Sequence, residues 1–200
     1  MGYMADLTEY TVLVFDICSS TVFIEDLVKT GELEAYCILV EDFRRMLAET
    51  ETERMLVYKF LGDGFILLFH SDVMLDGVLH MAKRLAEFAT FRLNAFTAEN
   101  VETTAIPRVG ITIGIDIGVL HSIELDGSRE FIGRALNLAS RLQGSLKEEE
   151  HVYKILMSVK AYKRISDPEI KRQCIERERI FRNISENNRT RCYELSAQWA

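Results

Sequence analysis

Val57-Tyr-Lys-Phe-Leu-Gly-Asp-Gly-Phe-Ile-Leu-Leu-Phe69 is the stretch that decides the fold, because it joins two apolar runs through a tight Gly62-Asp63-Gly64 turn. An Asp-Gly pair in this setting indicates a β-hairpin, with strands at about 56–61 and 65–70. The length of both runs predicts a central place in a sheet. Lys59 stands four residues before Asp63, so a strand of period two would put both side chains on one side. Inside Tyr-Lys-Phe-Leu, this lysine is poorly placed for a solvated face. Asp63 is either a structural turn residue or a functional carboxylate.

A second carboxylate, Asp16, interrupts the apolar run Thr11-Val-Leu-Val-Phe-Asp-Ile-Cys18, which predicts a buried strand at about 11–18. A buried carboxylate is costly unless it is paired or holds a cation. Asp16 by itself also suits a helix cap or turn. Together, Asp16 and Asp63 would converge on divalent metal, which makes a phosphate-handling enzyme the first hypothesis.

Ser19, Ser20 and Thr21 follow this strand and favour a helix N-cap. The backbone N–H groups of residues 18–21 would then meet a phosphate without a basic side chain. Further patterns predict helices on both sides of a break near Thr30-Gly31, a helix over 72–95 and a polar connection over 97–106. Beyond it they predict two β-rich segments over 108–125, a helix over 133–146, a strand near 152–158 and a helix near 159–165. A closing hairpin is expected over 179–184 and 191–195, with its turn at Asn187-Asn188.

This order predicts one mixed α+β domain over residues 1–200, with a core at about 11–196 and helices on one face of the sheet. The net charge of −7 argues against nucleic acid or an anionic membrane as a partner. No apolar stretch is long enough to span a membrane, and no signal peptide is evident. The four cysteines lack metal-type spacing and suit free thiols, so a cytoplasmic location is expected.

The predicted helix over 133–146 carries a polar pair opposite its apolar side. Asn137 and Arg141 lie one turn apart, where a solvated face is the ordinary explanation. Asparagine is a mediocre helix former, however, and Glu, Lys or Gln would serve solvation better. Arginine can neutralise phosphate oxygens, and asparagine can donate to a neighbouring oxygen.

These motifs together resemble the catalytic domain of class III nucleotidyl cyclases, from about Val12 to Leu195. The resemblance rests on Phe15-Asp16-Ile17-Cys18-Ser19-Ser20-Thr21, Lys59-Phe-Leu-Gly62-Asp63-Gly64-Phe65, Arg108-Val-Gly-Ile111 and Gly133-x3-Asn137-x3-Arg141. It implies a ferredoxin-like βααββαβ core that converts a nucleoside triphosphate, ATP in preference to GTP, into a cyclic nucleotide and pyrophosphate.

The resemblance also implies a role for each matching residue. Asp16, Asp63 and the Ile17 carbonyl would hold two Mg²⁺ or Mn²⁺ ions per site, and Asn137 and Arg141 would stabilise the transition state. Lys59 and Glu130 would select the base. The remaining substrate-binding positions are Cys18, Ser19, Ser20, Thr21 and Gly62. Because the family combines metal and Asn–Arg groups from opposite chains, it implies a homodimer with two equivalent sites. A regulatory domain in a longer parent protein is compatible with this reading.

Two departures from the family pattern bear on the substrate. Glu130 stands where adenylyl cyclases usually have Asp or Thr. A glutamate offers the same acceptor as an aspartate on a longer arm, so adenine is favoured, and guanine stays open. Arg134 replaces a frequent Asp and either sits near the site or decorates the helix start. The residue that binds the terminal phosphates is undecided among Arg179, Arg182, Arg189 and Arg191. The alternatives to an adenylate cyclase are a guanylate cyclase, a silent cyclase-like module that binds nucleotide or a partner, and a diguanylate cyclase, which lacks a counterpart of the Asn137/Arg141 helix.

Overall fold

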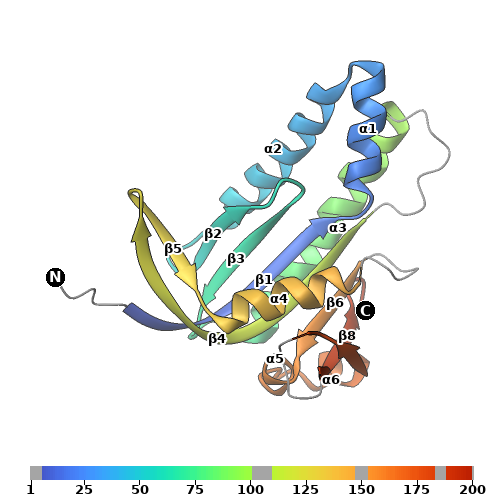
Figure 1. Cartoon of the computed structure of the whole chain (residues 1–200). Helices are drawn as coiled ribbons and strands as arrows, with labels where there is room; N and C mark the ends of the chain where they lie inside the picture. Colours follow the sequence, from blue (N-terminus) through green and yellow to red (C-terminus); the bar gives the residue numbers. More distant parts are fainter. Residues whose placement is uncertain (1–5, 101–109, 147–152, 183–187, 200) are drawn as a thin grey trace.

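The computed structural model describes residues 6–100, 110–146, 153–182 and 188–199. The elements before residue 101 are β1 (Asp6–Ile17), α1 (Ser20–Thr30), α2 (Leu33–Thr50), β2 (Met55–Phe60), β3 (Gly64–His70) and α3 (Leu75–Asn100). Those that follow are β4 (Ile111–Leu125), β5 (Ser128–Ile132), α4 (Arg134–Gly144), β6 (Lys154–Ser158), α5 (Val159–Lys163), α6 (Pro168–Gln173), β7 (Ile175–Ile180) and β8 (Arg189–Ser196). The mixed α+β class and the β-α-α-β-β-α-β order of the core are confirmed (Figure 1).

The described strands form one mixed sheet in the order β2-β3-β1-β4-β6-β8-β7, with β5 paired to β4 outside this path (Figure 1). β1 lies in the interior of the sheet, antiparallel to β3 on one side and to β4 on the other. β2 is an edge strand, so the expected central position holds only for the β3 half of the hairpin. β3 is accordingly buried along nearly its whole length, whereas β2 is exposed or half-buried after its first residue.

Helices cover both faces of the sheet, and the expectation of helices on one face is wrong. The side chains of β1 alternate between two apolar cores. Leu13 and Phe15 pack with α1, α2 and α3, whereas Val12 and Val14 pack with α4 on the opposite face. Figure 1 shows α4 in front of the sheet and α3 behind it. Because both faces of the middle of β1 are apolar, the alternation of its side chains could not predict which helix covers which face.

Two glycines of β4 let α4 approach the sheet closely. A Cβ atom on Gly114 would lie 2.0 Å from the Ala139 carbonyl oxygen, and one on Gly118 would lie 3.0 Å from the Ala135 Cβ. Only glycine at position 114 therefore permits the observed packing of α4. The four-residue spacing of these glycines, visible in the sequence, matches one helix laid across one strand.

Several expected boundaries differ from the structure. Residues 111–125 form one strand where two segments were expected, because the glycines of β4 make room for a helix without interrupting the strand. Residues 97–100 belong to α3, and the rest of the expected connection, 101–106, lies outside the described residues, as does Arg108. β5 and α6 were not expected.

The closing hairpin is also displaced from its predicted position. Its strands are Ile175–Ile180 and Arg189–Ser196. The prediction placed the first strand too late because charged residues alternate along β7 and hide its strand pattern. The expected turn at Asn187-Asn188 lies partly outside the described residues. Within the part of the chain that the structure describes, no helix is long and apolar enough to cross a membrane.

Candidate functional site

Asp16 and Asp63 meet at one end of β1. Asp16 pairs with Gly64 in the β1–β3 register, and the Ile17 N–H donates to the Asp63 carbonyl oxygen at 3.0 Å. The Ser20 hydroxyl donates to Asp63 Oδ2 at 2.5 Å, which ties the hairpin turn to the start of α1. Gly62 supplies the positive φ of 96° that this turn requires. Two carboxylates distant in the sequence are thereby brought together.

The start of α1 adjoins these carboxylates. Ser19 has a left-handed backbone (φ 64°) and its side chain forms no capping hydrogen bond, so the expected N-cap is absent. Ser20 uses its hydroxyl for Asp63, and Thr21 is exposed. The Cys18 N–H donates to the Gly110 carbonyl oxygen at 2.8 Å, which removes it from the N–H groups expected to meet a phosphate. The backbone N–H groups at the helix start, from Ser19 onward, can still meet a phosphate.

The surroundings of the two aspartates fit a hard divalent cation. Asp16 is only 4% exposed, and Gln143 Nε2 of α4 lies 3.5 Å from its Oδ2. The Tyr36 hydroxyl is buried nearby and makes no hydrogen bond of normal geometry with any described residue. Burial, and then the charges of Asp63 and Asp16, raise the pKa of Tyr36. Two carboxylates beside a buried, unsatisfied hydroxyl suit a hydrated Mg²⁺ or Mn²⁺ ion.

Metal ligands other than these two carboxylates are scarce. Among the described residues, no three His, Cys, Asp or Glu side chains gather in one place. Further ligands would then be backbone oxygens, such as the expected Ile17 carbonyl, hydroxyl or amide side chains, water or a substrate phosphate. This donor set is the kind that Mg²⁺ adopts on phosphate substrates.

Lys59 and Glu130 form a second cluster, on β2 and β5. The Lys59 ammonium donates to Glu130 Oε2 at 2.9 Å, and the Tyr58 hydroxyl donates to the same oxygen. The Tyr58 and then the Lys59 hydrogen bonds lower the pKa of Glu130, and the bond to Glu130 raises that of Lys59. The expectation that Lys59 avoids a solvated face is wrong, since its side chain is 49% exposed on an edge strand. The expectation that Lys59 and Asp63 share one side does not hold, because β2 ends at Phe60, before Asp63. Lys59 binds Glu130, whereas Asp63 binds Ser20.

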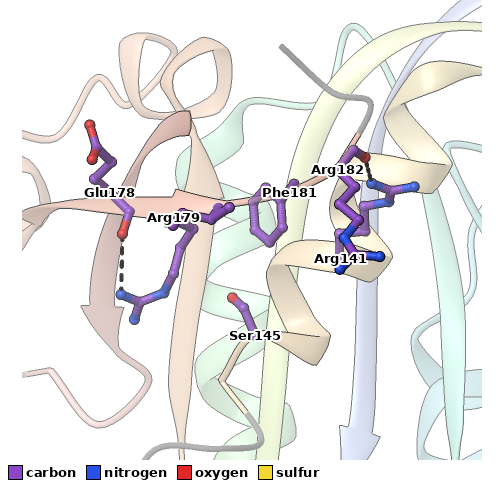
Figure 2. Close-up of a pocket in the computed structure, with 7 residues that line it drawn as sticks. Arg141, Ser145, Glu178, Arg179, Phe181 and Arg182 are labelled. Atoms are coloured by element: carbon purple, nitrogen blue, oxygen red, sulfur yellow. Dashed lines mark hydrogen bonds between the residues drawn. The ribbon is translucent and has the colours of Figure 1, made fainter. Parts of the chain in front are cut away.

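Asn137 and Arg141 lie on the exposed side of α4, as expected from the helical periodicity. Arg141 Nη1 donates to the carbonyl oxygen of Arg182 just beyond β7 (Figure 2). Arg141, Arg179 and Arg182 border an open hollow of about 840 Å³, whose lining is completed by Ser145, Glu178, Ile180 and Phe181. Arg189 instead pairs with Glu178 and Arg191 lies near Glu176. Arg179 and Arg182 thus join Arg141 at one cationic hollow.

The structure does not bring all the candidate residues together within one chain. Gln143, which approaches Asp16, lies on the buried side of α4, whereas Asn137 and Arg141 lie on its exposed side. The body of α4 therefore stands between the carboxylates and the Asn–Arg pair. Arg134 is exposed at the first turn of the same helix.

The fold is similar to that of solved adenylyl and guanylyl cyclases. The adenylyl cyclase CyaB from P. aeruginosa superposes with a TM-score of 0.71 at 18% identity, over 95% of this chain and 94% of that one. The guanylyl cyclase Cya2 superposes with a TM-score of 0.69 at 16% identity, over 97% and 93% of the two chains. This chain has the fold of a class III nucleotidyl cyclase catalytic domain.

A bacterial light-regulated adenylyl cyclase shows the same cyclase fold in part of a larger chain. It superposes with a TM-score of 0.72 at 14% identity over 98% of this chain, which spans 54% of that protein. At the level of sequence, no protein-family model and no curated relative matches the chain. At these identities the likeness establishes the cyclase fold alone.

Sequence reasoning missed three residues of this cyclase-fold site: Tyr58, Tyr36 and Gln143. Strand periodicity puts neighbouring residues on opposite faces, so Tyr58 was not expected beside Lys59. In the structure the β2–β3 register shifts between Val57 and Lys59, which makes Tyr58 a bulge residue. The bulge lets Tyr58 and Lys59 reach the same carboxylate. Tyr36 and Gln143 looked like ordinary helix residues, and their sequence neighbourhood carries no signal for a role beside Asp16.

Proposed function

We propose that this chain is a nucleotidyl cyclase, and specifically an adenylate cyclase that converts ATP into 3′,5′-cyclic AMP and pyrophosphate. The observation that carries the proposal is the meeting of Asp16 and Asp63 beside the start of α1, where Ser20 binds Asp63. A buried carboxylate and a half-buried one that converge in this way suit divalent cations and a polyphosphate. The cyclase fold supports cyclisation as the reaction class, and we take residues 11–196 as one catalytic core. The four cysteines form no disulfide with one another, which suits a cytoplasmic enzyme.

The reaction is attack of the ribose 3′-oxygen on the α-phosphorus, which forms a P–O bond, breaks the bond to pyrophosphate and releases the 3′-hydroxyl proton to solvent. Arg141 donates to the α-phosphate oxygens, where charge gathers in the transition state, and Asn137 donates to a neighbouring oxygen or the ribose ring ether. Asp16, Asp63 and the Ile17 carbonyl would hold two Mg²⁺ or Mn²⁺ ions, which when bound lower the pKa of the 3′-hydroxyl and neutralise the triphosphate.

Binding of the rest of the nucleotide falls to three parts of the chain. Lys59 donates to adenine N1 and Glu130 accepts from the N6 amine. The backbone of residues 19–21 and the Gly62 turn lie beside the phosphates. Arg179 and Arg182 take the terminal phosphates, which is supported by their place beside Arg141 at the cationic hollow (Figure 2).

We further propose that the active site is shared across a homodimer. This is supported by the position of α4, which separates Asp16 from Asn137 and Arg141 within one chain. In a symmetric dimer the carboxylates of one protomer and the Asn–Arg pair of its partner would complete each of two equivalent sites.

The test of the shared site mixes two inactive variants, Asp16→Ala and Arg141→Ala. Random association makes half of the dimers mixed, each with one intact site of two, so about a quarter of the wild-type activity should return. The control mixture of Asn137→Ala with Arg141→Ala, both in the same half-site, should recover no activity. An absence of rescue in the first mixture would refute the shared site.

The test of the activity itself is an assay of purified protein with ATP and with GTP, each in the presence of Mg²⁺ and of Mn²⁺. Cyclic AMP should be the main product. Guanine remains the alternative base, since Lys59 can donate to its O6 while Glu130 accepts from N1–H and the N2 amine. If neither cyclic nucleotide forms under the four conditions, the proposal fails and a catalytically silent nucleotide-binding module takes its place.

A further inference from the structure

Tyr58 is built into the wall that holds Glu130. Its hydroxyl donates to Glu130 Oε2 and accepts from the Phe131 N–H at 3.1 Å. Its ring packs edge-on against the Phe131 ring, with centroids 5.1 Å apart and planes at 87°. Three contacts to two consecutive residues of β5 fix this phenol more firmly than a surface tyrosine. The β2 bulge at Tyr58 is what turns the side chain toward β5.

One oxygen of Glu130 receives both available donors. The Tyr58 hydroxyl and the Lys59 ammonium end on Oε2, and no hydrogen bond to Oε1 accompanies them among the described residues. A carboxylate oxygen has two lone-pair positions, so Oε2 already has its full complement of donors. Glu130 therefore offers a ligand one acceptor, Oε1, instead of a fork of two oxygens.

Adenine and guanine present different numbers of hydrogen-bond donors to such a carboxylate. Adenine presents a single donor, its N6 amine, beside the N1 acceptor that Lys59 can serve. Guanine presents two adjacent donors, N1–H and the N2 amine, which a carboxylate binds best with both oxygens. A carboxylate with one oxygen committed leaves one guanine donor unpaired in the site, and unpaired polar groups are what produce strong discrimination.

We propose that Tyr58 is a positioning residue that makes Glu130 select adenine over guanine, by occupying one of its two carboxylate oxygens. This rests on the proposed cyclase function and deepens it. The hydroxyl also anchors the longer glutamate arm at a position where the sequence raised the question of base choice. Tyr58 acts through Glu130 and has no assigned contact with the reacting atoms.

The experiment compares Tyr58→Phe with the wild type in kcat/KM for ATP and for GTP. Loss of a hydrogen bond to a charged group should lower the ATP-to-GTP ratio by about 10-fold, mainly through better use of GTP. The matched control is Tyr193→Phe, because the Tyr193 hydroxyl also donates to a glutamate, Glu176 Oε2 at 3.1 Å, away from Lys59 and Glu130. The control should keep the wild-type ratio. An unchanged ratio in Tyr58→Phe overturns the proposal.

A second readout, independent of turnover, is the pKa of Glu130 measured by carbon NMR, with Glu130→Gln to assign the signal. Removing the Tyr58 hydroxyl should raise that pKa toward its ordinary value, because the phenol is the main group that lowers it. If no variant forms a cyclic product, the cyclase function fails, and calorimetric binding of ATP and GTP with Ca²⁺ decides the Tyr58 proposal separately. Equal selectivity of wild type and Tyr58→Phe in that binding, or no binding of either nucleotide, also overturns it.

Discussion

Replacing Gly114 by alanine should push α4 away from the sheet. The new methyl group would lie 2.0 Å from the Ala139 carbonyl oxygen and 2.5 Å from the Gln143 backbone nitrogen. Ordinary contact begins at 3.4 Å, so the helix must withdraw by the difference, about 1.4 Å. The obstructing atoms are backbone, and a side-chain rotation cannot relieve the clash.

The expected cost of this withdrawal is large for one methyl group. Overpacking a close-packed interface costs about 1–3 kcal/mol, and an obstructing backbone puts Gly114→Ala near the upper end, at about 2–3 kcal/mol. For a chain of this size the melting temperature should fall by roughly 4–12 °C. Because Asn137 and Arg141 are carried by α4, a shift of this size should also lower kcat about 100-fold while the protein is still folded.

The assay is urea unfolding followed by circular dichroism, together with cyclase activity well below the melting temperature. Gly144→Ala is the matched control, since it lies in the same helix and an added Cβ there meets nothing within 4 Å. The control should react as the wild type does and unfold at the same or a slightly higher urea concentration, because alanine is the better helix former. A free energy of unfolding for Gly114→Ala within about 0.5 kcal/mol of the wild type would refute the argument that Gly114 sets the helix position.

Two predictions concern buried carboxylates. Burial raises the pKa of Asp116. Ionisation of Asp116 therefore disfavours the folded state above that raised pKa and has no effect below the pKa of the unfolded chain. Asp116→Asn should unfold at a higher urea concentration than the wild type at pH 7, and urea titrations at lower pH should show this difference closing toward pH 3. Glu194 is nearly buried and accepts from Lys154 at 2.6 Å and Arg177 at 3.0 Å. Burial opposes these two bonds, yet they lower the pKa of Glu194 on balance, so its stabilisation exists above the unfolded pKa and is lost as pH falls through the folded one. Glu194→Gln should cost about 3 kcal/mol at pH 7 in calorimetric or urea unfolding and much less in acid, and an equal cost at both pH values would contradict the ion-pair explanation.

The sequence by itself determined the local elements that carry the two carboxylates. The Gly62-Asp63-Gly64 turn and the apolar runs around it define a hairpin, and the break at Thr30-Gly31 separates the two helices that follow Asp16. These signals are local, because turn chemistry and side-chain period depend on neighbours along the chain. The roles expected of Asp16, Asp63, Asn137 and Arg141 stay predictions until the activity is measured.

Tertiary structure alone decided how these elements combine. The bulge at Tyr58 arises from the pairing of β2 with β3, and a bulge reverses the side that period two would assign. The placement of α4 on the face opposite α3 depends on Gly114, whose importance lies in a helix distant in the sequence. The same placement separates Asp16 from Arg141. Register and helix position are set by contacts between distant segments, and no local pattern in the chain encodes them.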